Sequence, residues 1–308
     1  MLNATFSTLA AADPSQHVWN HVFWKSESGY WLWSGNQGNL VLSAIILIFG
    51  MSWVAKHVKT GDINAEGSGA YVTKNKFAHM IEVICIYLRD EVARPLLHDR
   101  TDKLMPFLWT VFFFILVNNL LGLIPIMDVL HLLVPAWKEG HMTPVGGTAT
   151  QNIWVTGVLA AIAGVVFNLA AISRLGIGGY FGHMTGGAPW FVAWMIFILE
   201  FMGQIVIKPV ALAIRLFANM TAGHILLATL IGFVGVVWNM GFAVKGPVTV
   251  ISVTGAFAIF ILEIFVAFLQ AFIFMFLTAV FISLMDHHDE HGHEHEHDHA
   301  SSHEHAHA

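Results

Sequence analysis

Four ionisable side chains lie within the two longest apolar stretches of the sequence, residues 191–238 and 248–285. An ionisable group at membrane depth costs at least about 2.5 to 3.5 kcal/mol on insertion scales, so each such group is a candidate functional residue. Groups of this kind can pass a proton through an apolar layer. The four are Glu200, Lys208, Arg215 and Glu263, and their polar companions are Gln204, Asn219, His224 and Gln270.

Arg215 has the strongest case, because a guanidinium group cannot give up its proton inside a protein. It requires an anion, yet the nearest carboxylate of its own stretch, Glu200, lies fifteen residues away. The anion is therefore expected on another chain. The alternative, that Arg215 caps a loop or extends to a lipid headgroup, is disfavoured by its place near the middle of the stretch. For Lys208 the alternative of a loop cap or a lipid-headgroup contact is stronger, so Lys208 is a secondary candidate.

On a regular helix, the polar residues share a face with small residues. Side chains within about 60° of Arg215 on a regular helix are Gln204, Lys208, Ala211, Ala218, Asn219 and Ala222. In residues 248–285, Glu263 and Gln270 are seven residues apart and share a face with Ala256 and Ala267. Because small residues allow close approach of another helix within lipid, each stretch is expected to present a small, polar stripe.

An antiparallel hairpin of the two stretches, with Gln270 beside Arg215, would bring His224 and Glu263 together. His224 lies nine residues after Arg215 and Glu263 seven residues before Gln270, which are shifts of about 13 Å and 10 Å in one direction. A histidine and a glutamate in contact could relay a proton at physiological pH. Since Glu200 lies on the other side of Arg215, two polar half-paths offset across one arginine are expected.

The composition is that of an all-α membrane protein, with 56% hydrophobic and 11% charged residues among 308. The expected membrane helices are residues 39–55, 104–127, 153–172, 191–238 and 248–285. As continuous helices the last two would be about 72 Å and 57 Å long, roughly twice a crossing, so they must tilt, bend or break. Candidate bend points are Pro209, Gly232 and Gly235. By spacing alone Asn119 is a helix-packing residue and a secondary candidate.

Eight of the fourteen Lys and Arg residues fall in residues 56–103, which places this segment in the cytoplasm. The amino-terminal segment 1–38, the loop 128–152 and the turn 239–247 are then external. Within the basic segment, an amphipathic helix over residues 75–94 is expected on the membrane surface, ending at Arg94-Pro95.

The tail, residues 286–308, is rich in histidine and is expected to be cytoplasmic and disordered. Weak zinc or nickel binding at His293, His295 and His297 is plausible, but no catalytic metal is expected, because nothing aligns these side chains. The acidic and histidine residues of the tail give no indication of a nucleic-acid partner.

Three motifs carry a family resemblance: KPVALAIRLFANMTAGH at 208–224, LQAFIFMFLTAVFISL at 269–284 and NNLLGLIPIMD at 118–128. In these motifs the chain resembles the F-type ATP synthase subunit a family. The resemblance implies about five membrane helices plus one surface helix, with the last two long, strongly tilted and paired as an antiparallel hairpin. It also implies a bacterial inner membrane protein with its amino terminus outside and its carboxyl terminus in the cytoplasm.

By this resemblance, Arg215 is the essential arginine that faces a carboxylate of the rotor ring. Asn219 and Gln270 are its polar neighbours, and His224 with Glu263 lines the outer half-channel. The implied partners are the rotor ring of c subunits, the peripheral-stalk b subunits, the rest of the ATP synthase and membrane lipid. No cofactor is expected, and the chain is not catalytic alone, because it carries no P-loop signature for ATP.

Glu200 resembles the exit-side carboxylate of the family, although its spacing to Lys208 is one residue longer than in some relatives. Other members exchange the acid and the histidine of the pair His224 and Glu263. Two other functions are alternatives. A secondary ion transporter would show internal pseudo-symmetry, which this sequence lacks. A metal-handling membrane protein is suggested only by the histidine tail.

Overall fold

The structure is a computed structural model, and it describes residues 22–25, 31–58, 73, 75–124, 126, 144–185 and 190–284. The expected histidine tail, with His293, His295 and His297, lies outside the described residues. So do most of the amino-terminal segment and most of the loop 128–152.

The prediction of an all-α membrane protein is confirmed. Within the described residues, five helical stretches are long and apolar enough to cross a membrane: Gly35–His57, Lys76–Leu123, Ile153–Gly182, Phe191–Val236 and Phe242–Ser283. A small antiparallel hairpin of β1 (Val22–Lys25) and β2 (Trp31–Ser34) precedes the first of them, which the sequence did not suggest.

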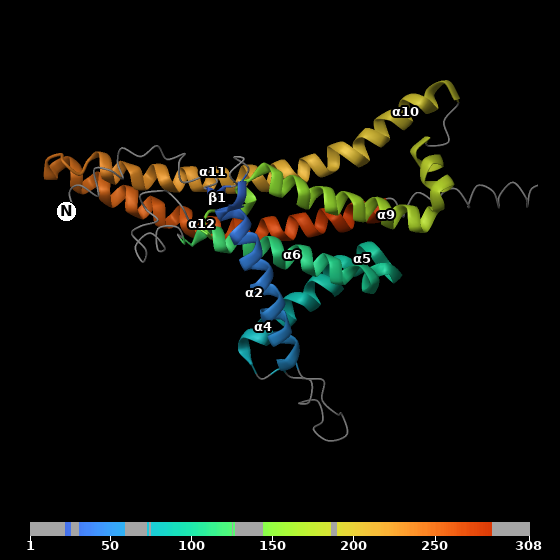
Figure 1. Ribbon diagram of the computed structural model, residues 1–308, viewed down its shortest axis with the longest axis horizontal. Coiled ribbons are helices and arrows are strands. Elements are labelled where there is room, and N and C mark those ends of the chain that lie inside the picture. The colour runs from blue at the N-terminus through green and yellow to red at the C-terminus, as the bar shows by residue number, and fades with distance from the viewer. Residues whose placement is uncertain are drawn as a thin grey trace, which may run out of the picture.

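The longest helix, α12 (Phe242–Leu284), lies between α11 (Lys208–Val236) and α6 (Thr101–Leu123), as Figure 1 shows. It also packs on α9 (Ile153–Thr185), which lies against α11. The buried core joins these helices, and its large members include Leu108, Phe112, Ile115, Phe167, Leu216 and Met275. Helix α2 (Gly35–His57) runs across this bundle (Figure 1) and packs on α6.

A capping box sets the start of α2. The Ser34 side chain accepts a hydrogen bond from the Gln37 backbone N–H, and the Gln37 side chain accepts one from the Ser34 N–H. This reciprocal pair satisfies two of the donors that a helix start leaves free. The helix therefore begins four residues before the expected residue 39.

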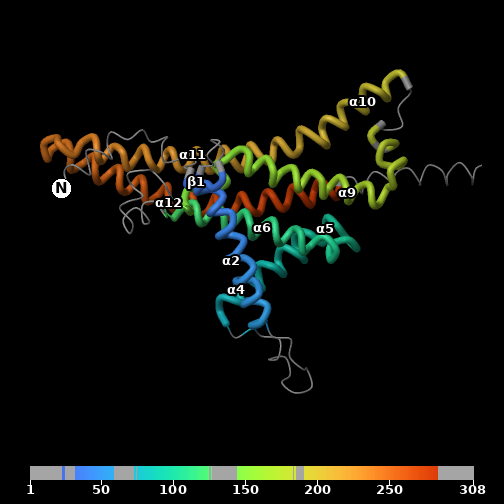
Figure 2. Tube along the Cα trace, viewed as in Figure 1, coloured from blue at the N-terminus to red at the C-terminus, as the bar shows by residue number. Residues whose placement is uncertain are grey.

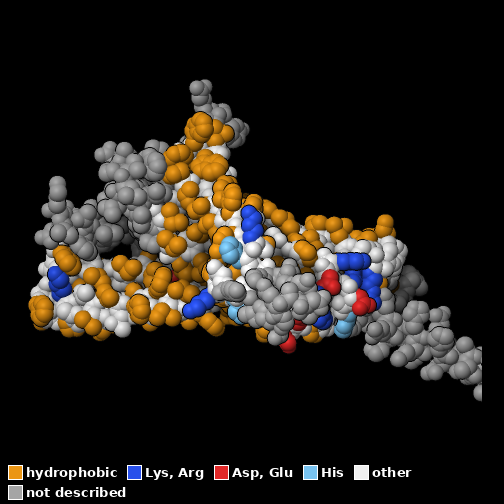
Figure 3. All heavy atoms as spheres, turned by 90° about the horizontal axis from the view of Figure 1, so that it is seen from below, with side chains coloured by type: hydrophobic (Ala, Val, Ile, Leu, Met, Phe, Trp, Pro, Cys, Tyr) orange, Lys and Arg blue, Asp and Glu red, His pale blue; other side chains and the backbone are white. Residues whose placement is uncertain are grey.

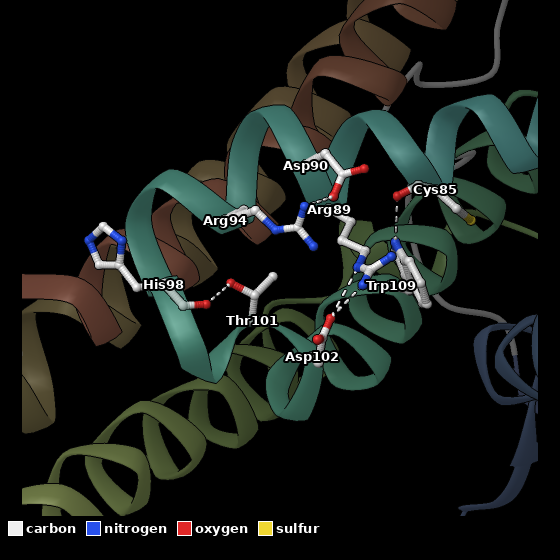
Figure 4. Close-up of polar contacts among 8 residues, drawn as sticks. All are labelled: Cys85, Arg89, Asp90, Arg94, His98, Thr101, Asp102 and Trp109. Atoms are coloured by element: carbon white, nitrogen blue, oxygen red, sulfur yellow. Dashed lines mark hydrogen bonds and ion pairs between the residues drawn. The ribbon is translucent and has the colours of Figure 1, made fainter.

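The basic segment forms a hairpin with α6. It runs through α4 (Lys76–Tyr87), the π-helical turn η3 (Leu88–Ala93), α5 (Arg94–Leu97) and the short 3-10 turn η4 (His98–Arg100). Two hydrogen-bonded contacts between the arms, drawn in Figure 4, show that the arms are antiparallel. Arg89 donates to Asp102 Oδ1 at 2.9 Å, and Trp109 Nε1 donates to the Cys85 carbonyl at 3.2 Å.

The expected helix end at Arg94-Pro95 is wrong, because helical structure continues to Leu97. Pro95 lies in the first turn of α5, directly after the π-helical turn η3, and the helix passes through it. The chain reverses instead at His98, which has a φ of 45°.

The expected single helix over residues 191–238 is divided. The structure places α10 at Trp190–Met202, a π-helical turn η6 at Gly203–Ile207, and then α11. Pro209 lies in the first turn of α11, and Gly232 lies within its regular part. Figure 2 shows α10 bending away from the line of α11, so the bend falls at η6 and not at the expected glycines.

The turn between the last two helices is shorter than the expected 239–247, because α12 already begins at Phe242 and includes Pro247. Helix α9 extends past the expected residue 172 to Thr185, with a kink at Gly176. Gly176 has a φ of 68°, a conformation that glycine adopts without strain and other residues rarely do.

The described surface is strongly apolar. Leu199 is 72% exposed, Ile251 70% and Phe242 88%, on α10 and α12. In Figure 3 hydrophobic side chains cover large areas of one face, while most of the acidic side chains gather on one part of it. Exposure of this extent is expected where lipid or another membrane helix covers the surface.

Candidate functional site

The antiparallel register of α11 and α12 follows from contacts along their length. His224 Nε2 lies 3.4 Å from Glu263 Oε1, and Lys208 Nζ lies 5.1 Å from the centre of the Phe281 ring. The sums of the paired residue numbers are nearly constant, as expected for two helices that run side by side in opposite directions. The predicted meeting of His224 and Glu263 is thus observed.

The Glu263 carboxyl group is buried between the two helices, with the residue 4% exposed. Its distance from His224 Nε2 is that of an ion pair, but neither carboxyl oxygen makes a hydrogen bond of good geometry among the described residues. Gly223 makes room for it, since a Cβ atom there would lie 2.6 Å from Glu263 Oε1. Among the described residues, the imidazole of His224 is therefore the charged or polar partner that lies within ion-pair distance of this carboxyl group.

A third group reaches the same imidazole from a segment that the sequence analysis treated as an external loop. Thr148 Oγ1 lies 3.1 Å from His224 Nε2. Thr148 precedes the short 3-10 helix η5 (Ala149–Gln151), and residues 148–151 are all buried. The segment 144–151, called the inserted segment below, therefore lies inside the helical bundle.

The inserted segment is bonded to the helices around it. Thr150 Oγ1 donates to Asn119 Oδ1 at 2.9 Å, and Gln151 Nε2 donates to the Met220 carbonyl at 3.3 Å. Asn119 Nδ2 in turn donates to the Ala267 carbonyl at 3.3 Å. Asn119, a secondary candidate on sequence grounds, thus links α6, α12 and the inserted segment.

A second set of buried amides lies where the inserted segment meets α2. Asn39 Nδ2 donates to the Gly147 carbonyl at 2.8 Å, and Asn118 Nδ2 donates to Ser43 Oγ at 2.9 Å. Asn39, Ser43 and Asn118 are each 0% exposed. Asn39 and Ser43 are not among the candidate residues predicted from the sequence. The sequence feature that could have identified them is the presence of two polar residues in an otherwise apolar helix.

The contact between α2 and the inserted segment depends on Gly38, where a Cβ atom would lie 1.9 Å from the Pro144 carbonyl oxygen. We expect Gly38→Ala to lower the stability of the folded chain by about 1 to 3 kcal/mol, because the backbone must shift. Gly50→Ala on the same helix, where nothing lies within 4 Å, is the control. The midpoint of thermal unfolding in detergent measures both. Equal midpoints for the two variants would show that the segment is not anchored there.

Arg215 points away from the bundle. It is exposed, and among the described residues it has no hydrogen bond or ion pair. The exposed residues around it on α11 are Ala211, Ala218, Asn219 and Ala222, the small and polar face that the sequence predicts. No anion of the part of the chain that the structure describes compensates the arginine on this face.

Gln270 is buried, 4% exposed, on α12, and no hydrogen bond joins it to Arg215. Its neighbours Ala267 and Ala271 are fully buried against the bundle. The structure thus places Gln270 inside and Arg215 outside, and it does not bring the two side chains into contact.

On the other side of Arg215 three polar side chains form a ladder. Gln204 Nε2 donates to Glu200 Oε1 at 2.8 Å, and Lys208 Nζ donates to Gln204 Oε1 at 2.6 Å. Gln204 is only 2% exposed, so its expected place on the exposed face of Arg215 is wrong. That expectation assumed a constant 100° per residue, whereas the π-helical turn η6 changes the phase at Gln204.

No group of three or more metal-ligating side chains occurs in the part of the chain that the structure describes. The site is a set of buried or half-buried ionisable and amide groups on both sides of an exposed arginine. Along the chain, Glu200 and His224 lie on opposite sides of Arg215, and His224 is about 13 Å away along the regular helix α11. The fold and this site define a multi-pass helical membrane protein with ionisable groups at membrane depth.

Comparison with known proteins assigns the chain to a particular family within this class. The sequence pattern of the family described as ATP synthase A chain matches residues 39–283. The chain belongs to this family.

Individual relatives agree with that assignment. The ATP synthase subunit a 2 of Chlorobaculum tepidum is 38% identical over 257 residues, 81% of this chain and 63% of the relative. The ATP synthase subunit a of Myxococcus xanthus is 40% identical over 229 residues, 72% of this chain and 66% of the relative. That of Chloroherpeton thalassium is 41% identical over 227 residues, covering 72% and 60%. The chain thus spans 60% to 66% of the length of these relatives.

Proposed function

We propose that the chain is the proton-channel stator subunit of a rotary ATP synthase, with two offset half-channels and Arg215 between them. The observation that carries the proposal is the position of Arg215. It is exposed and unpaired among the described residues, on a face of small side chains, with one ionisable cluster on each side of it along the helix. The missing anion is a carboxylate on the rotor ring of c subunits.

The outer half-channel contains His224, Glu263 and the polar neighbour Asn119. A proton passes through it to the rotor carboxylate, which becomes neutral and can move through lipid. When that carboxyl group reaches the other half-channel, the positive charge of Arg215 favours its charged form, and the proton leaves toward Glu200 and Gln204. Each proton that crosses about 100 mV supplies roughly 2.3 kcal/mol, so several are needed for each ATP.

Asn219 and Gln270 are proposed as polar neighbours of the rotor contact, and Lys208 as a secondary residue of the inner path. Asn219 shares the exposed face of Arg215, which supports its role. For Gln270 the support is weaker, because it is buried on α12. It would serve the rotor contact only after a change of side-chain position.

The chain is proposed to lie in a bacterial inner membrane, with its amino terminus outside and its carboxyl terminus in the cytoplasm. The excess of Lys and Arg in residues 56–103 supports this orientation. Besides the rotor ring, its partners are the b subunits of the peripheral stalk, the rest of the complex and lipid. The inserted segment then lies on the outer side, because its Thr148 contacts His224.

Proton conduction tests the proposal directly. Vesicles that hold the membrane sector, with the soluble catalytic part removed, should dissipate an imposed potential through this chain. Vesicles with the rotor ring and the stalk subunits but without this chain should hold the potential. Equal conduction by both preparations would show that the proton path lies elsewhere.

A further inference from the structure

The Thr148 side chain packs against α6 at Gly122, where only a glycine leaves enough space for it. A Cβ atom at Gly122 would lie 2.3 Å from Thr148 Oγ1 and 2.4 Å from its Cγ2. Both are far shorter than any real contact, so the side chain of Thr148 fills the space in which a larger residue at 122 would stand. Thr148 is 2% exposed, and its hydroxyl group is held in place from this side.

The hydroxyl group and the Glu263 carboxyl group reach the same nitrogen. Thr148 Oγ1 lies 3.1 Å and Glu263 Oε1 3.4 Å from His224 Nε2. Nε2 can hold one proton at most. When it holds none, it accepts a hydrogen bond from the Thr148 hydroxyl group, and when it holds one, it can donate that proton toward Glu263.

We propose that Thr148 is a relay residue that delivers protons to His224 Nε2, an inference that rests on the proposed function. The hydroxyl oxygen accepts a proton from a hydrated proton while it gives its own to Nε2, so the threonine ends the step unchanged. The positive charge is then on the imidazole ring, which passes the proton from Nε2 to the Glu263 carboxylate.

Residues close to Thr148 in the inserted segment also make polar contacts. The Gly147 carbonyl oxygen accepts a hydrogen bond from Asn39, so the backbone next to Thr148 is bonded to α2 and not to lipid. On the other side, Thr150 is bonded to Asn119. Thr148 therefore lies between two buried polar contacts of the inserted segment, and its own hydroxyl group contacts the imidazole.

The experiment compares Thr148→Val, which keeps the shape and removes the hydroxyl group, with Thr148→Ser, which keeps the hydroxyl group. Proton conduction by the membrane sector in vesicles, with the catalytic part removed, is the measurement. We expect Thr148→Val to conduct about tenfold more slowly and Thr148→Ser to conduct at nearly the unmodified rate. Thr148→Ala, which adds no apolar atom, should match Thr148→Val and serves if the valine variant does not assemble.

Thr156→Val is the matched control. Thr156 is also fully buried, but its hydroxyl group donates only to backbone carbonyls at the start of its own helix, so this variant should conduct normally. Normal conduction by Thr148→Val or Thr148→Ala would overturn the relay, and so would an equal loss in Thr148→Ser. If the unmodified membrane sector itself did not conduct, the proposed function would fail, and the relay with it.

Discussion

Arg215→Ala is expected to abolish both ATP synthesis and ATP-driven proton pumping while the complex still assembles. The side chain is exposed and has no partner among the described residues, so its loss removes no packing that holds this chain together. What is lost is a permanent positive charge opposite the rotor carboxylate. Lys208, seven residues earlier on α11, is bonded to Gln204 and is not expected to replace it. Pumping into inverted vesicles and the subunit content of the purified complex measure the two outcomes.

Two further variants define what Arg215 supplies. Arg215→Lys should also fail largely, because lysine can lose its proton in apolar surroundings and lacks the planar fork of arginine. Lys245→Ala removes a cation from the same hairpin, where Lys245 Nζ lies 3.7 Å from the centre of the Trp238 ring, and should leave pumping intact. Coupled pumping at the normal rate in an assembled Arg215→Ala complex would refute the proposed role.

The second large effect is expected from the pair His224 and Glu263. A change of either residue leaves its partner buried and poorly matched, so proton flux should fall strongly without loss of assembly. Because the two side chains are in contact, their effects on the activation free energy should be non-additive by about 0.5 to 3 kcal/mol. Flux through the membrane sector after removal of the catalytic part is the measurement.

Exchange of the two residues is the sharper experiment. His224→Glu combined with Glu263→His restores one acid and one imidazole at the same place, and should recover a substantial part of the flux that either single change removes. Two features favour the exchange. His224 Nε2 and Glu263 Oε1 are 3.4 Å apart, and Gly223 leaves space beside the Glu263 carboxyl group. If the double variant showed the plain sum of the two single losses, the residues would not share a site.

The register of the last two helices was predictable because their facing parts are regular. From Arg215 to His224 and from Glu263 to Gln270 the helices have no break, so counting 1.5 Å per residue sufficed to bring His224 and Glu263 together. The same counting failed at Gln204. A π-helical turn has no strong signature in residue type, and beyond it every angle measured from Arg215 is displaced.

The inserted segment could not be found from local pattern. Its residues are proline, valine, glycine, threonine, alanine and glutamine, a composition that is ordinary for an external loop. Residues 148–151 are buried because α2, α6 and α11, which are distant in sequence, pack against them. Only the tertiary structure shows that Thr148 and Thr150 belong to the same polar cluster as His224 and Asn119.

The π-helical turn η6 also bears on how this helix can change during evolution. One extra residue in a regular membrane helix would rotate everything beyond it by about 100° and advance it by about 1.5 Å. Helix α10 packs on α9 through Phe197 and Phe201 beside Tyr180 and Met184, and such a rotation would turn these rings out of the contact. A wide turn absorbs the added residue where it enters. The gene can therefore gain or lose one codon near Gly203 while the contacts on both sides persist, so chain length is free to drift here and is constrained elsewhere in α11.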